Sequence, residues 1–541
     1  MSAPRRNALL LVIGLCLTLA LSTINTVGAV PAPRVRVIVQ GQSLAAMEQA
    51  VQAANGIVAQ RLSLIQALAA DVPEAGLAAL RAQGLRVTLD MPVRASGQGQ
   101  RLPESSGFAE AIGVDQLWDT GLSGRGIGVA VLDTGIANHP DLLQDTRRPT
   151  RRVIARYDAL DRSKHGPDGY GHGTFMAGLI GNAARTRDGF AGIAPGVDLI
   201  DVRVMDHTGR GTQTDLIEGI QWVVEHKDRY HIRVMNLSLF SYVDGPYWAS
   251  PVNQAVEAAY QAGIVVVAAA GNLGAAPMSI AVPGNDPYVI TVGAFTDNYT
   301  PTDPGDDYIP PFSSVGPTET GFVKPELLAP GAHVVSTMLD SAVWAREHRD
   351  NRVRAGYYEA AGTSAATAVT SGVAALLLEA HPDWTPAQVK LHLMVTARPI
   401  ANSSLWTQGA GRLWAPAALA DTTVGDPHLG MTPGTPYVGP TVYRDGQFTL
   451  VHEDGALVAP EGYTWGGGYT WGGGYTWGGG YTWGGNTDWQ DWSEDQLWQS
   501  GYSWVDGYTW GGGYTWGGGY TWGGGYTWGG GYTWGGVQLL P

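Results

Sequence analysis

Three residues of the types used in nucleophilic catalysis occur along the chain in the order acid, base, hydroxyl. Asp133 ends an apolar run, His172 stands between two glycines, and Ser364 opens a long run of small and apolar residues. A serine hydroxyl is a weak nucleophile until an imidazole takes its proton, and a carboxylate can orient that imidazole. Each residue alone has an ordinary interpretation, Ser364 above all as a helix cap. Together the three predict the hydrolysis of an acyl bond.

The elements that must position these residues follow from the hydrophobic periodicity. Between residues 113 and 421, short apolar runs alternate with helical stretches, which predicts an α/β domain with a parallel sheet covered on both faces. The expected strands are 128–132, 199–204, 233–237, 264–270 and 288–292. Parallel sheets gather their functional groups beyond the carboxyl ends of the strands. Asp133 at a strand end and His172 and Ser364 at helix starts are therefore expected to meet there.

Six sequence blocks around these residues resemble the motifs of one family, the subtilisin-like serine proteases (subtilases, peptidase S8). They are Gly128-Val-Ala-Val-Leu-Asp-Thr-Gly135, Asp168-Gly-Tyr-Gly-His-Gly-Thr174, Val265-Val-Val-Ala-Ala-Ala-Gly-Asn272, Phe312-Ser-Ser-Val-Gly-Pro317, Lys324-Pro-Glu-Leu-Leu-Ala-Pro-Gly331 and Gly362-Thr-Ser-Ala-Ala-Thr-Ala-Val-Thr-Ser-Gly372. The resemblance implies a three-layer subtilisin-like domain that cleaves polypeptides through a triad of Asp133, His172 and Ser364. It also implies that Asn272 donates a hydrogen bond to the oxyanion.

The same resemblance implies where a substrate binds. Ser238, Leu239 and Phe240 would form an edge that pairs with an extended peptide. The primary pocket would be rimmed by Ala269, Ala270 and Gly271. The family usually has glycine where Phe240 stands, so both the pocket size and the strand pairing stay open. Small or medium apolar side chains before the cleaved bond are the expectation.

Three segments precede the catalytic domain. Residues 1–29 carry two arginines, an apolar run and a small-residue exit, which is typical of a secretory signal, with an uncleaved anchor as the alternative. The only cysteine, Cys16, lies in that run, so the processed protein would have no disulfide. Residues 30–96 alternate in period as β-α-β-β-α-β, which predicts a small ferredoxin-like α+β unit. Its similarity to the family's propeptide implies an intramolecular inhibitor, followed by a linker with the maturation site at 97–112.

Two segments follow the catalytic domain. Residues 422–462 are rich in Pro and Gly and are interpreted as a linker with a small β element. In residues 463–541 the unit Tyr-Thr-Trp-Gly-Gly recurs with a period of six, four times from Tyr463 and five times from Tyr508. This low-complexity tail is either a stacking platform for polysaccharide, cell envelope or a partner repeat, or a stalk that tethers the protease.

Composition limits the ligands. The net charge of −15 excludes a strongly basic nucleic-acid binder. Catalysis by the three residues needs no cofactor and no metal. The loop at 183–190, where family members often bind structural calcium, holds Arg185 and Arg187 beside Asp188, a poor set of ligands for a hard cation. Acidic loops such as Asp303–Asp307 leave another calcium site open.

Two functions are compatible with these features. The first is a secreted serine endopeptidase made as an inactive precursor. The second is a catalytically silent protein of the cell surface that binds or adheres through its aromatic repeats. The presence of all three triad residues together with Asn272 favours the enzyme.

Overall fold

The computed structural model describes residues 34–41, 43–95, 107–145, 148–162, 165–183, 191–444, 447–451 and 457–458, and three short strands between residues 503 and 517. The predicted signal segment and most of the repeat tail lie outside these residues. The chain divides into two compact units, one of Met1–Arg61 with Gln66–Leu89, the other of Leu62–Ile65 with Asp90–Pro541.

The first unit is a four-stranded sheet with two helices. Its elements are β1 (Arg34–Gln40), α2 (Leu44–Ala53), β2 (Ile57–Leu62), β3 (Ala67–Pro73), α3 (Glu74–Ala82) and β4 (Arg86–Leu89), whereas the 3-10 turn η1 (Ser63–Ile65) between β2 and β3 is grouped with the second unit. The spatial order is β2-β3-β1-β4, and β1 is antiparallel to both neighbours. Val37, Met47 and Leu68 are fully buried in its core. The element order is the one that the changes of period predict.

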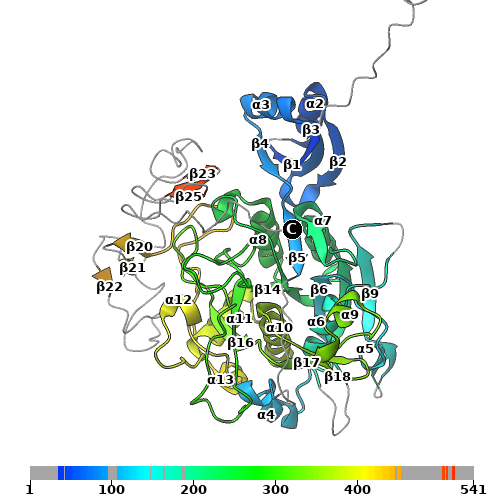
Figure 1. Cartoon of the computed structure of the whole chain (residues 1–541), viewed down its shortest axis with the longest axis vertical. Coiled ribbons are helices and arrows are strands. Elements are labelled where there is room, and N and C mark those ends of the chain that lie inside the picture. The colour runs from blue at the N-terminus through cyan, green and yellow to red at the C-terminus, as the bar shows by residue number, and fades with distance from the viewer. Residues whose placement is uncertain are drawn as a thin grey trace, which may run out of the picture. The chain divides into compact units, whose positions relative to one another are not determined.

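The second unit is built on a seven-stranded sheet. In spatial order its strands are β16 (Leu327–Pro330), β15 (Ile290–Phe295), β14 (Val265–Ala269), β12 (Ile232–Leu237), β6 (Gly128–Asp133), β10 (Asp198–Arg203) and β9 (Val153–Asp158) (Figure 1). All neighbours pair in parallel. Every residue of β6, β14 and β15 is buried, as a sheet covered on both faces requires. The predicted fold class is confirmed, although the outer strands β9 and β16 were not among the expected ones.

Helices cover both faces of this sheet. On one face, α6 (His172–Gly181) packs against α10 (Thr363–Ala380), and α10 runs along β12, β14 and β15. On the other face, α7 (Gln213–His226) and α8 (Pro251–Gln261) pack against each other. Among the described residues α10 is the one helix long and apolar enough to cross a membrane, and it is 89% buried inside the domain, as is typical of a core helix.

Shorter elements complete the second unit. They are β5 (Pro92–Ala95), η2 (Glu110–Ile112), α4 (Val114–Asp119), α5 (Pro140–Leu143), β7 (Gln144–Asp145), β8 (Arg148–Arg151), β11 (Arg210–Thr212), β13 (Leu239–Phe240), η3 (Tyr247–Ala249), β17 (Val334–Thr337), α9 (Val343–Glu347), η4 (Arg349–Asn351), β18 (Arg352–Arg354), β19 (Tyr357–Ala360), α11 (Pro386–Val395), α12 (Leu405–Gln408), α13 (Ala415–Ala420), β20 (Thr441–Arg444), β21 (Gln447–Val451), β22 (Leu457–Val458), β23 (Ser503–Val505), β24 (Gly507–Thr509) and β25 (Thr515–Gly517).

Both predicted linkers are partly wrong. Phe108 and Ile112, near the end of the 97–112 linker, are buried in the main core. In the 422–462 linker, His428 is buried and the Tyr437 N–H donates to the Tyr247 hydroxyl at 3.2 Å. Polar or Pro- and Gly-rich composition indicates irregular backbone, but the apolar and aromatic side chains in these segments gain free energy by packing on the domain.

Candidate active site

Asp133 and His172 form a buried pair. Asp133 is the last residue of β6 and His172 the first of α6, and the side chains are at most 1% exposed. The imidazole Nδ1 lies 2.8 Å from Asp133 Oδ1 and 2.9 Å from Oδ2. The Thr134 N–H also donates to Oδ1, at 2.7 Å. The carboxylate therefore holds one edge of the imidazole and sets its orientation.

Glycines allow the strand end and the helix start to approach this closely. A Cβ atom on Gly173 would lie 2.2 Å from the Gly135 carbonyl oxygen. Gly171 adopts a φ of 106° just before the imidazole, a backbone conformation that favours glycine. The glycines on both sides of His172 thus serve the close backbone contact that the sequence motif indicates.

Asp168 supports this turn, and the sequence motifs assigned it no role. Its carboxylate accepts hydrogen bonds from the Thr134 hydroxyl at 2.9 Å, from the Gly171 N–H at 2.7 Å and from the Thr174 N–H at 2.9 Å. Complete burial raises its pKa, and these hydrogen bonds act in the opposite direction. The only sequence signal is its place four residues before His172. Asp168 fastens the end of β6 to the start of α6.

Ser364 is the second residue of α10 and does not cap the helix. The N-cap is Gly362, which has no side chain to accept a hydrogen bond. The Ser364 hydroxyl donates to the Ser238 carbonyl oxygen at 3.1 Å, and the Ser238 hydroxyl donates to the Ser364 carbonyl oxygen at 2.8 Å. The capping alternative for Ser364 is therefore wrong, and the residue is tied to the end of β12.

The sheet register brings Ser364 to the same edge as the Asp133–His172 pair. Strand β12 lies between β6 and β14, with Asn236 opposite Val131 and Leu237 opposite Ala268. Ser238 therefore follows β12 where Asp133 ends β6. The His172 Nε2 atom is buried and has no hydrogen-bond partner within the described chain. The hydroxyl of Ser364 thus bonds to Ser238 and not to His172, and such a nucleophile–base contact commonly tightens only when substrate binds.

Asn272 lies beyond β14 at this edge. Its Oδ1 atom accepts hydrogen bonds from the N–H and the hydroxyl of Thr363, both at 2.9 Å. These bonds hold the amide beside the first residue of α10, next to Ser364. The Nδ2 atom is buried, and no described residue accepts a hydrogen bond from it. Asn272 thus keeps an unused donor while its acceptor oxygen binds Thr363, the neighbour of Ser364.

An extended segment of the chain already pairs with the strand that follows Ser238. Strand β5 lies antiparallel between β11 and β13, with Ala95 opposite Leu239 and Arg94 opposite Phe240. The Ser241 hydroxyl donates to the Pro92 carbonyl oxygen at 2.9 Å. The ring of Phe240 packs edge-on against Tyr242 at 5.8 Å. The bulky residue that replaces the family's glycine therefore does not prevent strand pairing.

The three residues expected to rim the primary pocket lie at the end of β14. Ala269, Ala270 and Gly271 are buried, and Gly271 has a φ of 110°. A Cβ atom at Gly271 would lie 2.9 Å from the Ser314 hydroxyl, so the backbone needs glycine here. Their role in a pocket stays a prediction.

Residues 124–428 match the model of the subtilase family. That span is more than half of the chain and contains all four candidate residues, Asp133, His172, Asn272 and Ser364. The chain belongs to the subtilase family. Subtilases are serine endopeptidases, and the site formed by these four residues lies within the matched span.

Known relatives agree with this assignment. The subtilase is 39% identical over 277 residues to the serine protease AprX of Bacillus subtilis (strain 168), a match that covers 50% of this chain and 60% of AprX. It is 30% identical over 412 residues to Subtilisin NAT of Bacillus subtilis subsp. natto, covering 74% and 96%. The chain thus spans less than two thirds of AprX. The crystal structure of fervidolysin from Fervidobacterium pennivorans, a keratinolytic enzyme related to subtilisin, has the same fold, with a TM-score of 0.58 and 23% identity over 77% of this chain and 67% of fervidolysin.

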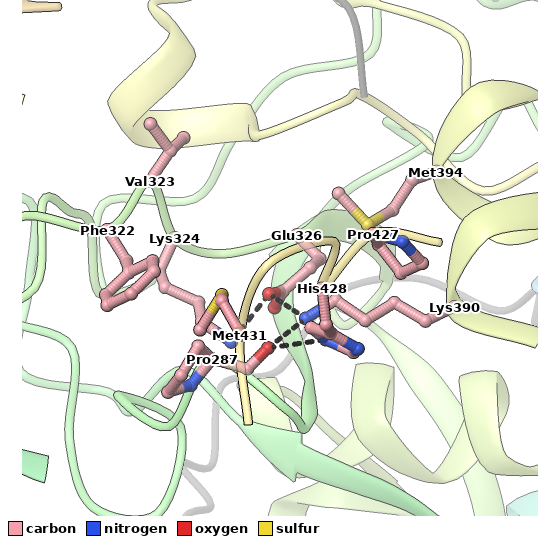
Figure 2. A pocket seen from close by; sticks show the side chains of 10 residues that line it. All are labelled: Pro287, Phe322, Val323, Lys324, Glu326, Lys390, Met394, Pro427, His428 and Met431. Atoms are coloured by element: carbon pink, nitrogen blue, oxygen red, sulfur yellow. Dashed lines mark hydrogen bonds and ion pairs between the residues drawn. The ribbon is translucent and has the colours of Figure 1, made fainter. Parts of the chain in front are cut away.

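A second cluster of buried charges in the subtilase, the lysine cluster, consists of Lys324, Glu326 and Lys390 (Figure 2). The ammonium groups lie 2.6 and 2.7 Å from Glu326 Oε1. Beside them is a cavity of about 20 Å³, which has room for about one water molecule. The lysine cluster therefore lines a space too small for a peptide.

Calcium ligation finds little support in the described residues. No group of three or more His, Cys, Asp or Glu side chains there is arranged to hold a metal ion. The loop at 184–190 lies outside them. In the acidic loop, Asp306 accepts hydrogen bonds from Asn298 and Thr300, and Asp307 pairs with Arg412. A structural calcium site stays a prediction.

Proposed function

We propose that this subtilase is a secreted serine endopeptidase, made as a precursor, that hydrolyses polypeptides through Asp133, His172 and Ser364 with Asn272 as an oxyanion donor. One observation carries the proposal. The Asp133–His172 pair and Ser364 share one sheet edge, where His172 Nε2 and Asn272 Nδ2 are both buried without a partner in the described chain. A buried polar atom without a partner costs free energy, and a transition state that completes both bonds recovers that cost.

The chemistry follows from these atoms. His172 Nε2 takes the proton of the Ser364 hydroxyl as the oxygen attacks the carbonyl carbon, and Asp133 stabilises the imidazolium formed. The negative charge on the former carbonyl oxygen is met by the Asn272 amide and the Ser364 N–H at the start of α10. The imidazolium then protonates the departing amine, which leaves the acyl group on Ser364. Water attacks this acyl-enzyme while His172 takes a proton from it, and His172 returns that proton to the Ser364 oxygen as the acid product leaves.

Substrates bind as β5 does. An extended peptide between β11 and β13 gains main-chain hydrogen bonds whatever its sequence, so side-chain pockets set the preference. Val93, an apolar residue of β5, is fully buried in this position. Small or medium apolar side chains near the cleaved bond are the proposed preference.

The position of β5 supports self-processing. Ala95 pairs with Leu239, the neighbour of Ser238, whose carbonyl oxygen accepts the Ser364 hydroxyl. We propose that residues 30–96 are the propeptide and that maturation cleaves the bond between Ser96 and Gly97. N-terminal sequencing should find Gly97 first in the purified enzyme, and the Ser364→Ala variant should keep its propeptide.

Export and anchoring complete the proposal. The charged and apolar segment 1–29 would direct secretion. The aromatic repeats of 463–541 would hold the enzyme on a polysaccharide or another cell-envelope ligand by ring stacking. Deletion of residues 463–541 should leave peptide turnover unchanged and abolish retention on cell envelopes. Retention by the truncated enzyme would remove the anchoring role.

A fluorophosphonate probe tests the enzyme itself. The wild-type protein, once its propeptide is removed, should be labelled at Ser364, and the Ser364→Ala variant should not be labelled. A mature wild-type protein that the probe does not modify would contradict the proposed function and favour a catalytically silent binding protein.

A further inference from the structure

An indole ring lies against the candidate base. Trp344, on the short helix α9, is 5% exposed, and its ring centroid is 5.5 Å from that of His172 at an interplanar angle of 42°. The rings of Phe175 and Tyr170 pack on the same indole, at 5.6 and 6.4 Å. Asp133 contacts the imidazole along its Nδ1 edge, whereas Trp344 contacts the ring itself.

The segment that carries Trp344 is fastened to the turn before His172. The Val343 N–H donates to the Gly169 carbonyl oxygen at 2.9 Å, and the Trp344 N–H donates to the Tyr170 carbonyl oxygen at 3.0 Å. A Cβ atom at Gly171 would lie 2.8 Å from the Cβ of Ala342. The backbones of the two segments therefore meet with no space between them. The indole is thereby held against the imidazole by backbone hydrogen bonds as well as by ring packing.

Contacts between residues 338–340 and 352–358 join the two ends of the segment that carries Trp344. Asp340 accepts from the Arg352 guanidinium at 2.7 Å and from the Tyr358 hydroxyl at 3.0 Å. The Met338 N–H donates to the Gly356 carbonyl oxygen at 2.9 Å. These contacts join the two ends of the segment 338–356, which carries Trp344 against His172.

We propose that Trp344 is a positioning residue for His172, an inference that rests on the proposed function. A carboxylate bound to one nitrogen leaves the imidazole free to rock about that bond. The indole removes this freedom and keeps Nε2 aimed at the Ser364 side of the site. It also excludes water from the ring, and its π face attracts the imidazolium that forms during the reaction. Displacement of a catalytic group by about 1 Å can lower a rate about 100-fold.

The test separates kcat from KM in purified mature enzyme. Trp344→Ala should lower kcat by about 10- to 100-fold, with KM for a peptide substrate changed by less than about threefold, because a positioning residue acts on the base and not on substrate binding. Trp344→Phe keeps a flat ring at the same place and should restore most of kcat. Trp222→Ala is the matched control, since Trp222 is also packed between rings, Tyr157 and His226, but lies on α7. It should keep the wild-type kcat.

Three outcomes would overturn the positioning role. They are an unchanged kcat in Trp344→Ala, a loss confined to KM, and a loss that Trp344→Phe does not reduce. If Trp344→Ala does not fold, Trp344→Leu decides, because leucine keeps an apolar contact without the ring and should show the same loss of kcat. Failure of the fluorophosphonate probe on wild-type enzyme would instead reject the proposed function.

Discussion

The active site and the lysine cluster are both groups of buried charge, and they differ in how completely their polar atoms are paired. Lys324 Nζ donates to the carbonyl oxygens of Asp286 and Val289 at 2.7 and 3.2 Å, besides its ion pair with Glu326. Lys390 Nζ donates to the carbonyl oxygen of Pro287 as well as to Glu326 (Figure 2). In the active site, by contrast, His172 Nε2 and Asn272 Nδ2 have no partner among the described residues.

This difference in pairing indicates a different role for each group of buried charges. The charged groups of the lysine cluster are paired with one another and with backbone carbonyl groups, so we expect variants of this cluster to affect folding and not catalysis. Burial lowers the pKa of the Lys324 ammonium, and the attraction of Glu326 opposes that shift. Atoms left unpaired in the candidate active site cost stability, and in the proposed mechanism they are the atoms that stabilise the transition state. Variants of the two clusters should therefore affect different quantities.

The largest expected effect is on rate. Asp133→Asn should lower kcat by about 10⁴-fold, because the amide favours the wrong imidazole tautomer and cannot stabilise the imidazolium. The thermal midpoint should change little, since the amide keeps the shape of the carboxylate. Steady-state kinetics and calorimetry on the same sample measure both. A variant with wild-type kcat would show that the Asp133–His172 pair is structural, like the lysine cluster.

The next effect is on stability alone. Glu326→Ala leaves two buried ammonium groups without their carboxylate and should lower the free energy of unfolding by about 3–5 kcal/mol. The kcat of the folded fraction should stay at the wild-type value. Denaturant unfolding checks the first statement, and active-site titration with fluorophosphonate checks the second. Glu326→Gln, which keeps the hydrogen-bond acceptor, should lose less. A fall in kcat per titrated site would link the lysine cluster to catalysis.

Variants of Asn272 separate the role of its acceptor oxygen from that of its donor nitrogen. Asn272→Ala should lower kcat by about 10²- to 10³-fold, a loss of about 3–4 kcal/mol in transition-state stabilisation. Asn272→Asp keeps the oxygen that accepts from Thr363 and replaces the donor nitrogen by a charged carboxylate oxygen. The Asp variant should lose at least as much activity as the Ala variant, because its charge also repels the oxyanion, with KM nearly unchanged in both. If the Asp variant is as active as wild type, the amide is only a support for α10.

The last effect is a change in the pH dependence of stability at Glu319. Burial raises the pKa of Glu319 from 4.5 to about 8, and its carboxyl accepts from the Tyr247 N–H. Between these pH values the folded protein keeps a proton that the unfolded chain has lost. The free energy of unfolding should therefore fall with rising pH, by up to about 1.4 kcal/mol per pH unit. Glu319→Gln should flatten that slope in denaturant unfolding at pH 5 to 8. An unchanged slope would show that Glu319 is ionised in the folded state.

Local motifs predict most of the candidate site. The block ending in Asp133-Thr-Gly135 predicts a carboxylate at a strand end, and β6 does end at Asp133. The block around His172 predicts a helix start among glycines, and α6 begins at that residue. The position of a residue at a strand end or a helix start can be predicted, because the ends of these elements depend on neighbouring residues in the sequence. Trp344 could not be found in this way, since its partner His172 is far away along the chain and only the folded domain brings the two rings together.

Composition was a poorer guide to segment boundaries. The Pro- and Gly-rich residues after 421 indicate a linker, yet His428 is buried and its imidazole Nε2 lies 3.0 Å from the Pro287 carbonyl oxygen. Whether such a segment packs depends on a complementary surface elsewhere in the chain, which local composition does not contain.

The sequence by itself determined which residue types stand at each strand end and helix start, because turns, caps and strands are set by neighbours along the chain. Only the tertiary structure decided which polar atoms find partners. Pairing depends on residues far apart in sequence. The Ser364 hydroxyl donates a hydrogen bond to the Ser238 carbonyl oxygen, whereas the Nε2 atom of His172 is left without a partner in the described chain.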